Sequence, residues 1–109
     1  MTTLARLSPL LEDLLVRLVH AERSLPGEHK EGIYVLDLPG GQVCIVFAGL
    51  DQTLVESAAT FEALVDLGYL EWRSAAKSLR PFGITLRGQA YVDQVETPRF
   101  HMPSQYPIA

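Results

Sequence analysis

The sequence lacks several features that would assign a small protein to a class. Its 109 residues include a single cysteine, Cys44, so no disulfide can form within the chain, and we expect a reducing, cytoplasmic environment. No apolar run reaches the roughly 18 residues of a membrane span. Charged residues such as Arg6, Glu12 and Asp13 interrupt the N-terminal leucines, which argues against a signal peptide. We therefore expect a soluble protein with no membrane contact.

Motifs that mark enzymes and cofactor sites are also missing. His20, His29 and His101 are scattered, and Cys44 has no second cysteine nearby, so no metal-ligand spacing is present. The glycine pair at 40–41 lies between two predicted strands, which indicates a turn rather than a phosphate-binding loop. Neither a Walker sequence nor a GxSxG motif occurs. We expect no catalysis, no cofactor, no bound metal and no small-molecule substrate.

What the chain does have is the composition of one packed domain. It is 48% hydrophobic and 20% charged, which favours a globular fold over disorder. We expect residues 1–97 to form a single domain. Residues 98–109 contain three prolines and are predicted to be an extended tail.

The first predicted element is a helix over residues 8–23. Ser8 is a suitable N-cap and Pro9 a suitable first helical residue. Leucines at helical spacing form one wide apolar face: Leu7, Leu11, Leu14 and Leu18. Such a face is buried either by two neighbours within the chain or in a homodimer.

A hairpin is predicted next, with strands 33–38 and 42–47. Pro39 and Gly40 suit the two central positions of a tight turn. Residues 43–47 are apolar at five successive positions, so we expect both faces of this strand to be covered.

A second helix is predicted over 51–68, with Asp51 as its cap and Gly68 as its left-handed end. Its expected buried face is Leu54, Ala58, Phe61 and Val65. This segment contains no Lys or Arg, and it has four acidic residues: Asp51, Glu56, Glu62 and Asp66. Beyond it, two strands around the loop "SAAKS" lead to Thr85, the predicted cap of a last helix that Pro98 ends.

Residues 53–96 resemble a winged-helix domain. The resemblance rests on "LVDLGYL" before the two-stranded hairpin and on Thr85, Leu86 and Gly88 after it. It implies a recognition helix at 51–67 and a wing at 69–86, although the hairpin at 33–47 replaces the usual second helix. The expected fold is thus α+β and winged-helix-like: N-terminal helix, hairpin, central helix, wing, C-terminal helix and tail.

The predicted wing and its surroundings carry a local positive charge in a chain of net charge −4. The basic residues are Arg73, Lys77, Arg80 and Arg87, and no acid lies between residues 72 and 92. They are expected to contact DNA phosphates, to contact an acidic partner, or to balance the acidic remainder of the chain. Carboxylates near phosphates repel them by roughly 1–4 kcal/mol per pair, so reading DNA through helix 51–67 is disfavoured.

Two functions follow from these patterns. The first is a non-catalytic interaction module that binds itself or a protein partner through helix 8–23, the acidic helix or the tail. In the tail, Phe100 and Tyr106 are the candidate contacts. The alternative is a DNA-binding transcriptional regulator that contacts the phosphate backbone weakly through its basic wing.

Overall fold

The computed structural model describes residues 6–25, 32–48, 53–74 and 79–104, with the backbone alone for 97–104. The elements in chain order are α1 (Pro9–Arg23), β1 (Ile33–Leu38), β2 (Gln42–Phe47), β3 (Thr53–Ser57), α2 (Ala58–Asp66), β4 (Leu70–Trp72), β5 (Leu79–Ile84) and α3 (Leu86–Ser104). The chain therefore has an α+β fold, as predicted.

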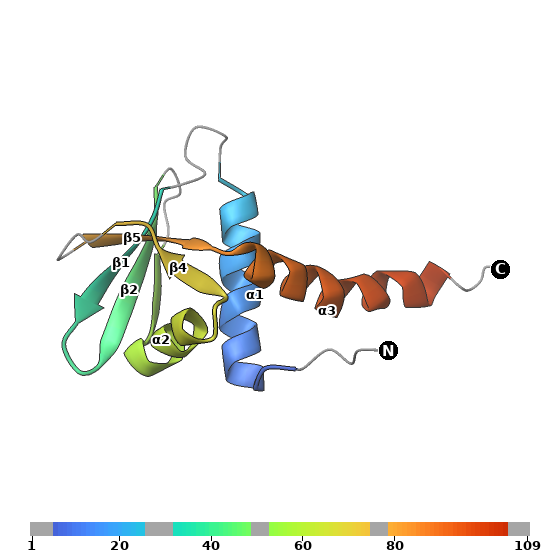
Figure 1. Cartoon of the computed structure of the whole chain (residues 1–109), viewed down its shortest axis with the longest axis horizontal. Coiled ribbons are helices and arrows are strands. Elements are labelled where there is room, and N and C mark those ends of the chain that lie inside the picture. Colours follow the sequence, from blue (N-terminus) through green and yellow to red (C-terminus); the bar gives the residue numbers. More distant parts are fainter. Residues whose placement is uncertain (1–5, 26–31, 49–52, 75–78, 105–109) are drawn as a thin grey trace.

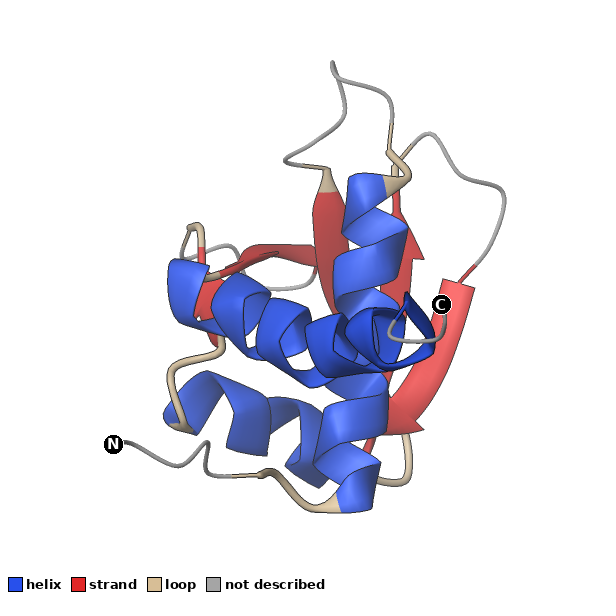
Figure 2. Cartoon of the chain, turned by 90° about the vertical axis from the view of Figure 1, so that its right-hand side faces the viewer, coloured by secondary structure: helices blue, strands red, loops and turns tan. Residues whose placement is uncertain are grey.

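The strands form one antiparallel sheet in the order β3-β2-β1-β5-β4. In Figure 1, α1 stands beside the sheet, and α2 and α3 lie on the same side as α1. Seen from that side, α1 and α3 lie in front of the strands (Figure 2), and α2 contacts β2, β3 and β4. The sheet thus has an inner face that packs against helices and an outer face without a helix among the described elements.

Helix α1 begins as predicted. The Ser8 hydroxyl accepts a hydrogen bond from the Leu11 amide at 3.4 Å, and Pro9 is the first helical residue. Leu14 and Leu18 are fully buried in the core, and Leu7 and Leu11 pack against it. The leucine face is therefore buried within the chain, so Leu14 and Leu18 are not on the surface for a partner to contact.

The hairpin has the predicted bounds. Gly40 and Gly41 have φ values of 81° and 74°, which residues with a Cβ rarely adopt. This conformation lets the three residues 39–41 reverse the chain, and it sets the register in which Leu38 pairs with Gln42.

The prediction of a helix over 51–68 is wrong in its first part. Residues 53–57 form β3, which pairs antiparallel with β2, and the helix begins only at Ala58. Ser57, rather than Asp51, caps it and accepts a hydrogen bond from the Thr60 amide at 3.5 Å. In "TLVES" the β-branched Thr53 and Val55 alternate with Leu54, a pattern that suits a strand paired to an apolar neighbour. Asp51 lies outside the described residues.

Of the four residues predicted to form the buried face of helix 51–68, Phe61 is buried, and Leu54, Ala58 and Val65 are partly buried against the core. Phe47, Phe61 and Phe82 are buried, whereas Trp72 is 37% exposed at the end of β4. The Trp72 ring still contacts Phe61, with 5.7 Å between the ring centroids. Gly68 follows the last residues of helix α2 and has a φ of 87°, the left-handed conformation predicted for it.

Helix α3 starts at the predicted cap but continues beyond its predicted end. The Thr85 hydroxyl accepts from the Gly88 amide at 3.0 Å and donates to the Gly68 carbonyl at 2.7 Å. The helix passes through Pro98 to Ser104, although a proline inside a helix removes one backbone hydrogen bond and crowds the carbonyl four residues before it. Phe100 is therefore in this helix, whose C-terminal part extends away from the body (Figure 1). Tyr106 lies outside the described residues.

A cluster around Tyr91 ties α3 to the start of α1. The Tyr91 hydroxyl donates to Glu12 Oε1 at 2.6 Å and accepts from the Leu7 amide at 2.8 Å. Arg6 donates to the other Glu12 oxygen at 2.8 Å. Burial, and then the hydrogen bond to Glu12, raise the pKa of the Tyr91 hydroxyl above its usual value.

Replacing Tyr91 by Phe should lower the free energy of unfolding by about 1–2 kcal/mol at pH 7, because Glu12 and the Leu7 amide lose a buried partner. The raised pKa of Tyr91 also predicts a dependence of stability on pH.

The folded state holds the Tyr91 proton more tightly than the unfolded state. The stability that this difference contributes is present below about pH 10 and is lost as pH rises through the folded pKa. Urea titrations from pH 7 to 11 should show an alkaline decline that is smaller in Tyr91→Phe. An equal decline in both proteins would contradict this assignment.

Gly88 marks a close approach between α3 and the chain entering β4. A Cβ at this position would lie 2.5 Å from the Tyr69 carbonyl oxygen and 2.8 Å from Ile84 Cγ2. Gly88→Ala should therefore destabilise the protein by about 1–3 kcal/mol, although the same change at an open helical site stabilises. Exposed Gln94→Ala in the same helix is the control, with a shift within about 0.5 kcal/mol in thermal or urea unfolding.

Candidate interaction surface

The most unusual surface in the structure is the outer face of the sheet. We define it by the outward-pointing residues of four strands: Tyr34, Leu36 and Leu38 of β1; Gln42, Cys44 and Val46 of β2; Thr53, Val55 and Ser57 of β3; and Leu79, Pro81 and Gly83 of β5. Side chains alternate between the two faces along a strand, so these positions share one side. None of these described positions carries a charged residue. A charged pair borders the face at β4, where Glu71 is the register partner of Gly83 and the Arg73 guanidinium covers Gly83.

Strand register aligns the outer face into two rows that cross the sheet. One row runs Val55–Cys44–Leu36–Leu79, because each residue is the register partner of the next. The second row runs Thr53–Val46–Tyr34–Pro81 in the same way. Seven of these eight residues have apolar or aromatic side chains, or proline. The outer face is therefore continuous across four strands.

The outer face is open to solvent where it is most apolar. Val55, Leu79 and Leu36 are 54%, 45% and 36% exposed, and Cys44 and Val46 are half-buried. Four strands about 4.8 Å apart and about 20 Å long give a face of roughly 400 Å². Apolar patches of about 300–600 Å² are the largest that monomeric proteins usually expose, and they are often functional.

The structure corrects the prediction that both faces of residues 43–47 are covered. Val43, Ile45 and Phe47 are buried under the helices, while no described helix lies over Cys44 and Val46. A run of apolar residues predicts apolar faces but not what covers them. The sequence signal was limited to β1 and β2, which are apolar at outward as well as inward positions and so predict two apolar faces without showing which one is open.

The basic residues of the predicted wing do not form one positive patch among the described residues. On β5, Arg80 pairs with Asp37 at 3.0 Å and lies over the Trp72 ring, 4.4 Å from its centroid. Arg73, after β4, lies 3.8 Å from Glu71 and its guanidinium covers Gly83.

The other two basic residues are Arg87 and Lys77. On α3, Arg87 is exposed and its guanidinium carbon lies 4.8 Å from the centroid of the Tyr69 ring. Lys77 lies outside the described residues. The three described arginines thus belong to separate local contacts, and two of them are paired with carboxylates.

The acidic helix is also different from the prediction. Glu56 belongs to β3 and pairs with Arg17 at 2.7 Å, so only Glu62 and Asp66 of the four acids lie on α2. The expected stripe of four carboxylates on one helix is therefore wrong. The reason is the strand at 53–57, which takes Glu56 out of the helix.

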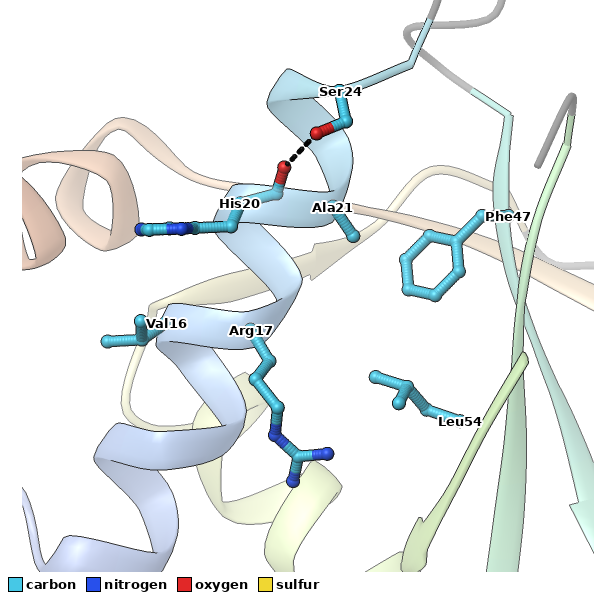
Figure 3. Close-up of a pocket in the computed structure, with 7 residues that line it drawn as sticks. All are labelled: Val16, Arg17, His20, Ala21, Ser24, Phe47 and Leu54. Atoms are coloured by element: carbon cyan, nitrogen blue, oxygen red, sulfur yellow. Dashed lines mark hydrogen bonds between the residues drawn. The ribbon is translucent and has the colours of Figure 1, made fainter. Parts of the chain in front are cut away.

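A cavity of about 350 Å³ lies between α1 and strands β2 and β3 (Figure 3). Its lining residues are Val16, Arg17, His20, Ala21, Ser24, Phe47 and Leu54. The polar groups are already engaged: Arg17 with Glu56, His20 with Glu96 at 2.9 Å, and the Ser24 hydroxyl with the His20 carbonyl at 3.0 Å.

The orientation of these groups argues against a polar ligand. In Figure 3 the His20 ring points away from Phe47 and Leu54. The hydrogen bond from Arg17 to Glu56 raises the pKa of the guanidinium, which stays protonated and paired. The cavity thus has apolar walls but no unengaged polar side chain, among those described, to orient a ligand.

The described part of the chain has neither a metal-binding cluster nor a membrane-spanning helix. No three His, Cys, Asp or Glu residues in the described part of the chain are grouped to hold a metal ion. None of the described helices is long and apolar enough to cross a membrane. Comparisons of the chain with protein-family models, with curated proteins and with solved structures find no match.

The assignment of faces can be tested with two neighbouring residues of β1. Leu36→Ser should lower the free energy of unfolding by less than about 1 kcal/mol, because this side chain is on the outer face. Val35→Ser should cost roughly 2–4 kcal/mol, because Val35 is fully buried on the inner face. Urea denaturation at low protein concentration measures both, and similar values would show that the two faces are wrongly assigned.

Proposed function

We propose that this chain is a non-catalytic protein-interaction module and that its contact surface is the outer face. The observation that carries the proposal is the pair of apolar rows across β3, β2, β1 and β5, which are uncharged and lack a covering helix among the described elements. The leucine-rich face of α1, which the sequence also offers, is less suitable because Leu14 and Leu18 are in the core.

The energetics favour a partner for this face. Antiparallel sheets that face water usually place polar residues on the solvated side. At 25 cal/mol per Å², a face of roughly 400 Å² would gain at most about 10 kcal/mol on burial if all of it were apolar, before the costs of association. The two apolar rows gain free energy from contact and carry no charge to desolvate, which is the chemistry of the centre of a protein interface.

DNA binding through the wing has weaker support. Affinity for DNA comes mainly from neutralising phosphates, and this needs cations that are free to meet them. Arg80 and Arg73 each have a carboxylate within 4 Å, which a phosphate would have to displace. Moreover, α2 carries Glu62 and Asp66 and no base.

The winged-helix resemblance stays a prediction. The order α2, β4, β5, α3 and the Thr85 cap support it. The part of the chain before α2 differs from that pattern, because three paired strands stand where a winged helix has its second helix.

Site-directed photo-cross-linking tests the proposed contact surface. A benzophenone amino acid at Leu36, at the centre of the outer face, should give a covalent adduct when the protein is irradiated in its native cells. The matched control is Leu10, an exposed leucine of α1 that is 61% accessible. Adducts from position 36 and none from position 10 are expected. No adduct from position 36, or equal yields from both, would contradict the proposal.

A further inference from the structure

We propose that the occupant of the outer face is a second copy of this chain, packed sheet on sheet with two-fold symmetry. The inference rests on the proposed function and adds the identity of the partner. The charge on the two sides of the molecule favours this arrangement.

The acidic residues are concentrated on the helical side. Nine of the ten described acids are on helices or on the inner face: Glu12, Asp13, Glu22, Asp37, Glu56, Glu62, Asp66, Asp93 and Glu96. The tenth, Glu71, is at the β4 edge and lies 3.8 Å from Arg73. Arg6, Arg17, Arg23, Arg80 and Arg87 lie on the same side, but the nine acids outnumber them. Two copies of a chain with net charge −4 therefore repel each other least when their helical sides point apart.

Contact between the two outer faces achieves this separation. Packed sheets lie about 10 Å apart, and each helix layer adds about 10 Å more, so the two acidic layers are about 30 Å from each other. At physiological salt the screening length is about 8 Å, so repulsion between those layers is largely lost. A contact through the helices would bring at least one acidic layer toward the second copy.

The outer face is also complementary to itself. A two-fold contact places the same surface on both partners, which requires a patch that does not oppose like charges. The two apolar rows meet this requirement because they are uncharged, and the Glu71–Arg73 pair lies beside them at the β4 edge. Aligned sheets pack with strands about 30° apart and side chains interdigitated, which brings Leu36, Cys44 and Val46 to the middle of the contact.

The area predicts the strength of the dimer. About 400 Å² from each copy is half of what a standard stable interface buries per partner. We therefore expect a weak dimer that dissociates on dilution, with each copy fully folded by its own core.

Sedimentation velocity over a range of protein concentrations tests this inference. The wild-type protein should sediment faster as its concentration rises. The double variant Leu36→Lys, Leu79→Lys should associate at least tenfold more weakly, because each lysine would face apolar surface across the contact. The control is Leu10→Lys, Leu86→Lys, which adds the same charge at leucines that are 61% and 88% exposed and away from the outer face. It should associate like the wild type.

A second readout uses the wild-type chain. Cys44 is the single thiol and lies in one of the apolar rows, so dimerisation should shield it. Its rate constant for reaction with a maleimide should fall severalfold as the concentration passes through the range in which the sedimentation coefficient rises. This measurement decides the question even if the Leu36→Lys, Leu79→Lys variant does not fold.

The outcomes separate this inference from the proposed function. If the wild-type protein stays monomeric at every concentration, the inference that the partner is a second copy of the chain is wrong. If position 36 then cross-links to a protein of another mass, the interaction module stands without self-association. A dimer that survives Leu36→Lys, Leu79→Lys in folded protein, or that leaves Cys44 reactivity unchanged, would place the contact on another surface and overturn the inference.

Discussion

Burial of α1 against the inner face of the sheet is the interaction on which the rest of the structure depends. Leu14, Leu15, Leu18 and Val19 are fully buried together with strand residues such as Ile45. The same helix contacts α2 and α3, and its first turn receives the Tyr91 hydrogen bond. Because the three described helices gather on this one side, the other side of the sheet is left to solvent or to a partner.

This one-sided packing explains why strands with two apolar faces are compatible with a folded monomer. The inner face supplies a core that needs no metal or disulfide, and the side chains of the outer face shield one another along the cross-strand rows. Charge is kept where it can be paired: Arg17 with Glu56, Arg23 with Asp93, and Arg80 with Asp37. The exposed pairs among them contribute little individually, so their main effect is to keep the helical side solvated.

Local signals in the sequence predicted the parts of the fold that depend on few residues. Ser8, Gly40, Gly68 and Thr85 act where their chemistry indicated, and both hairpin strands have the predicted bounds. The errors arise where distant segments decide. "TLVES" is a strand because β2 offers it a partner, and "VCIVF" is covered on one side because the helices all pack there. Pairing partners and the placement of layers are not encoded in the periodicity of a single segment, so the outer face could not be located from the sequence.

The absence of charge from the described positions of the outer face also determines how a contact there responds to temperature. Near 25 °C the burial of apolar surface is driven almost entirely by entropy and has a negative heat capacity change. Such a contact weakens on cooling, whereas one built from ion pairs and hydrogen bonds need not follow this trend. A contact made through the apolar rows at Leu36 and Val46 would therefore be weakest in the cold.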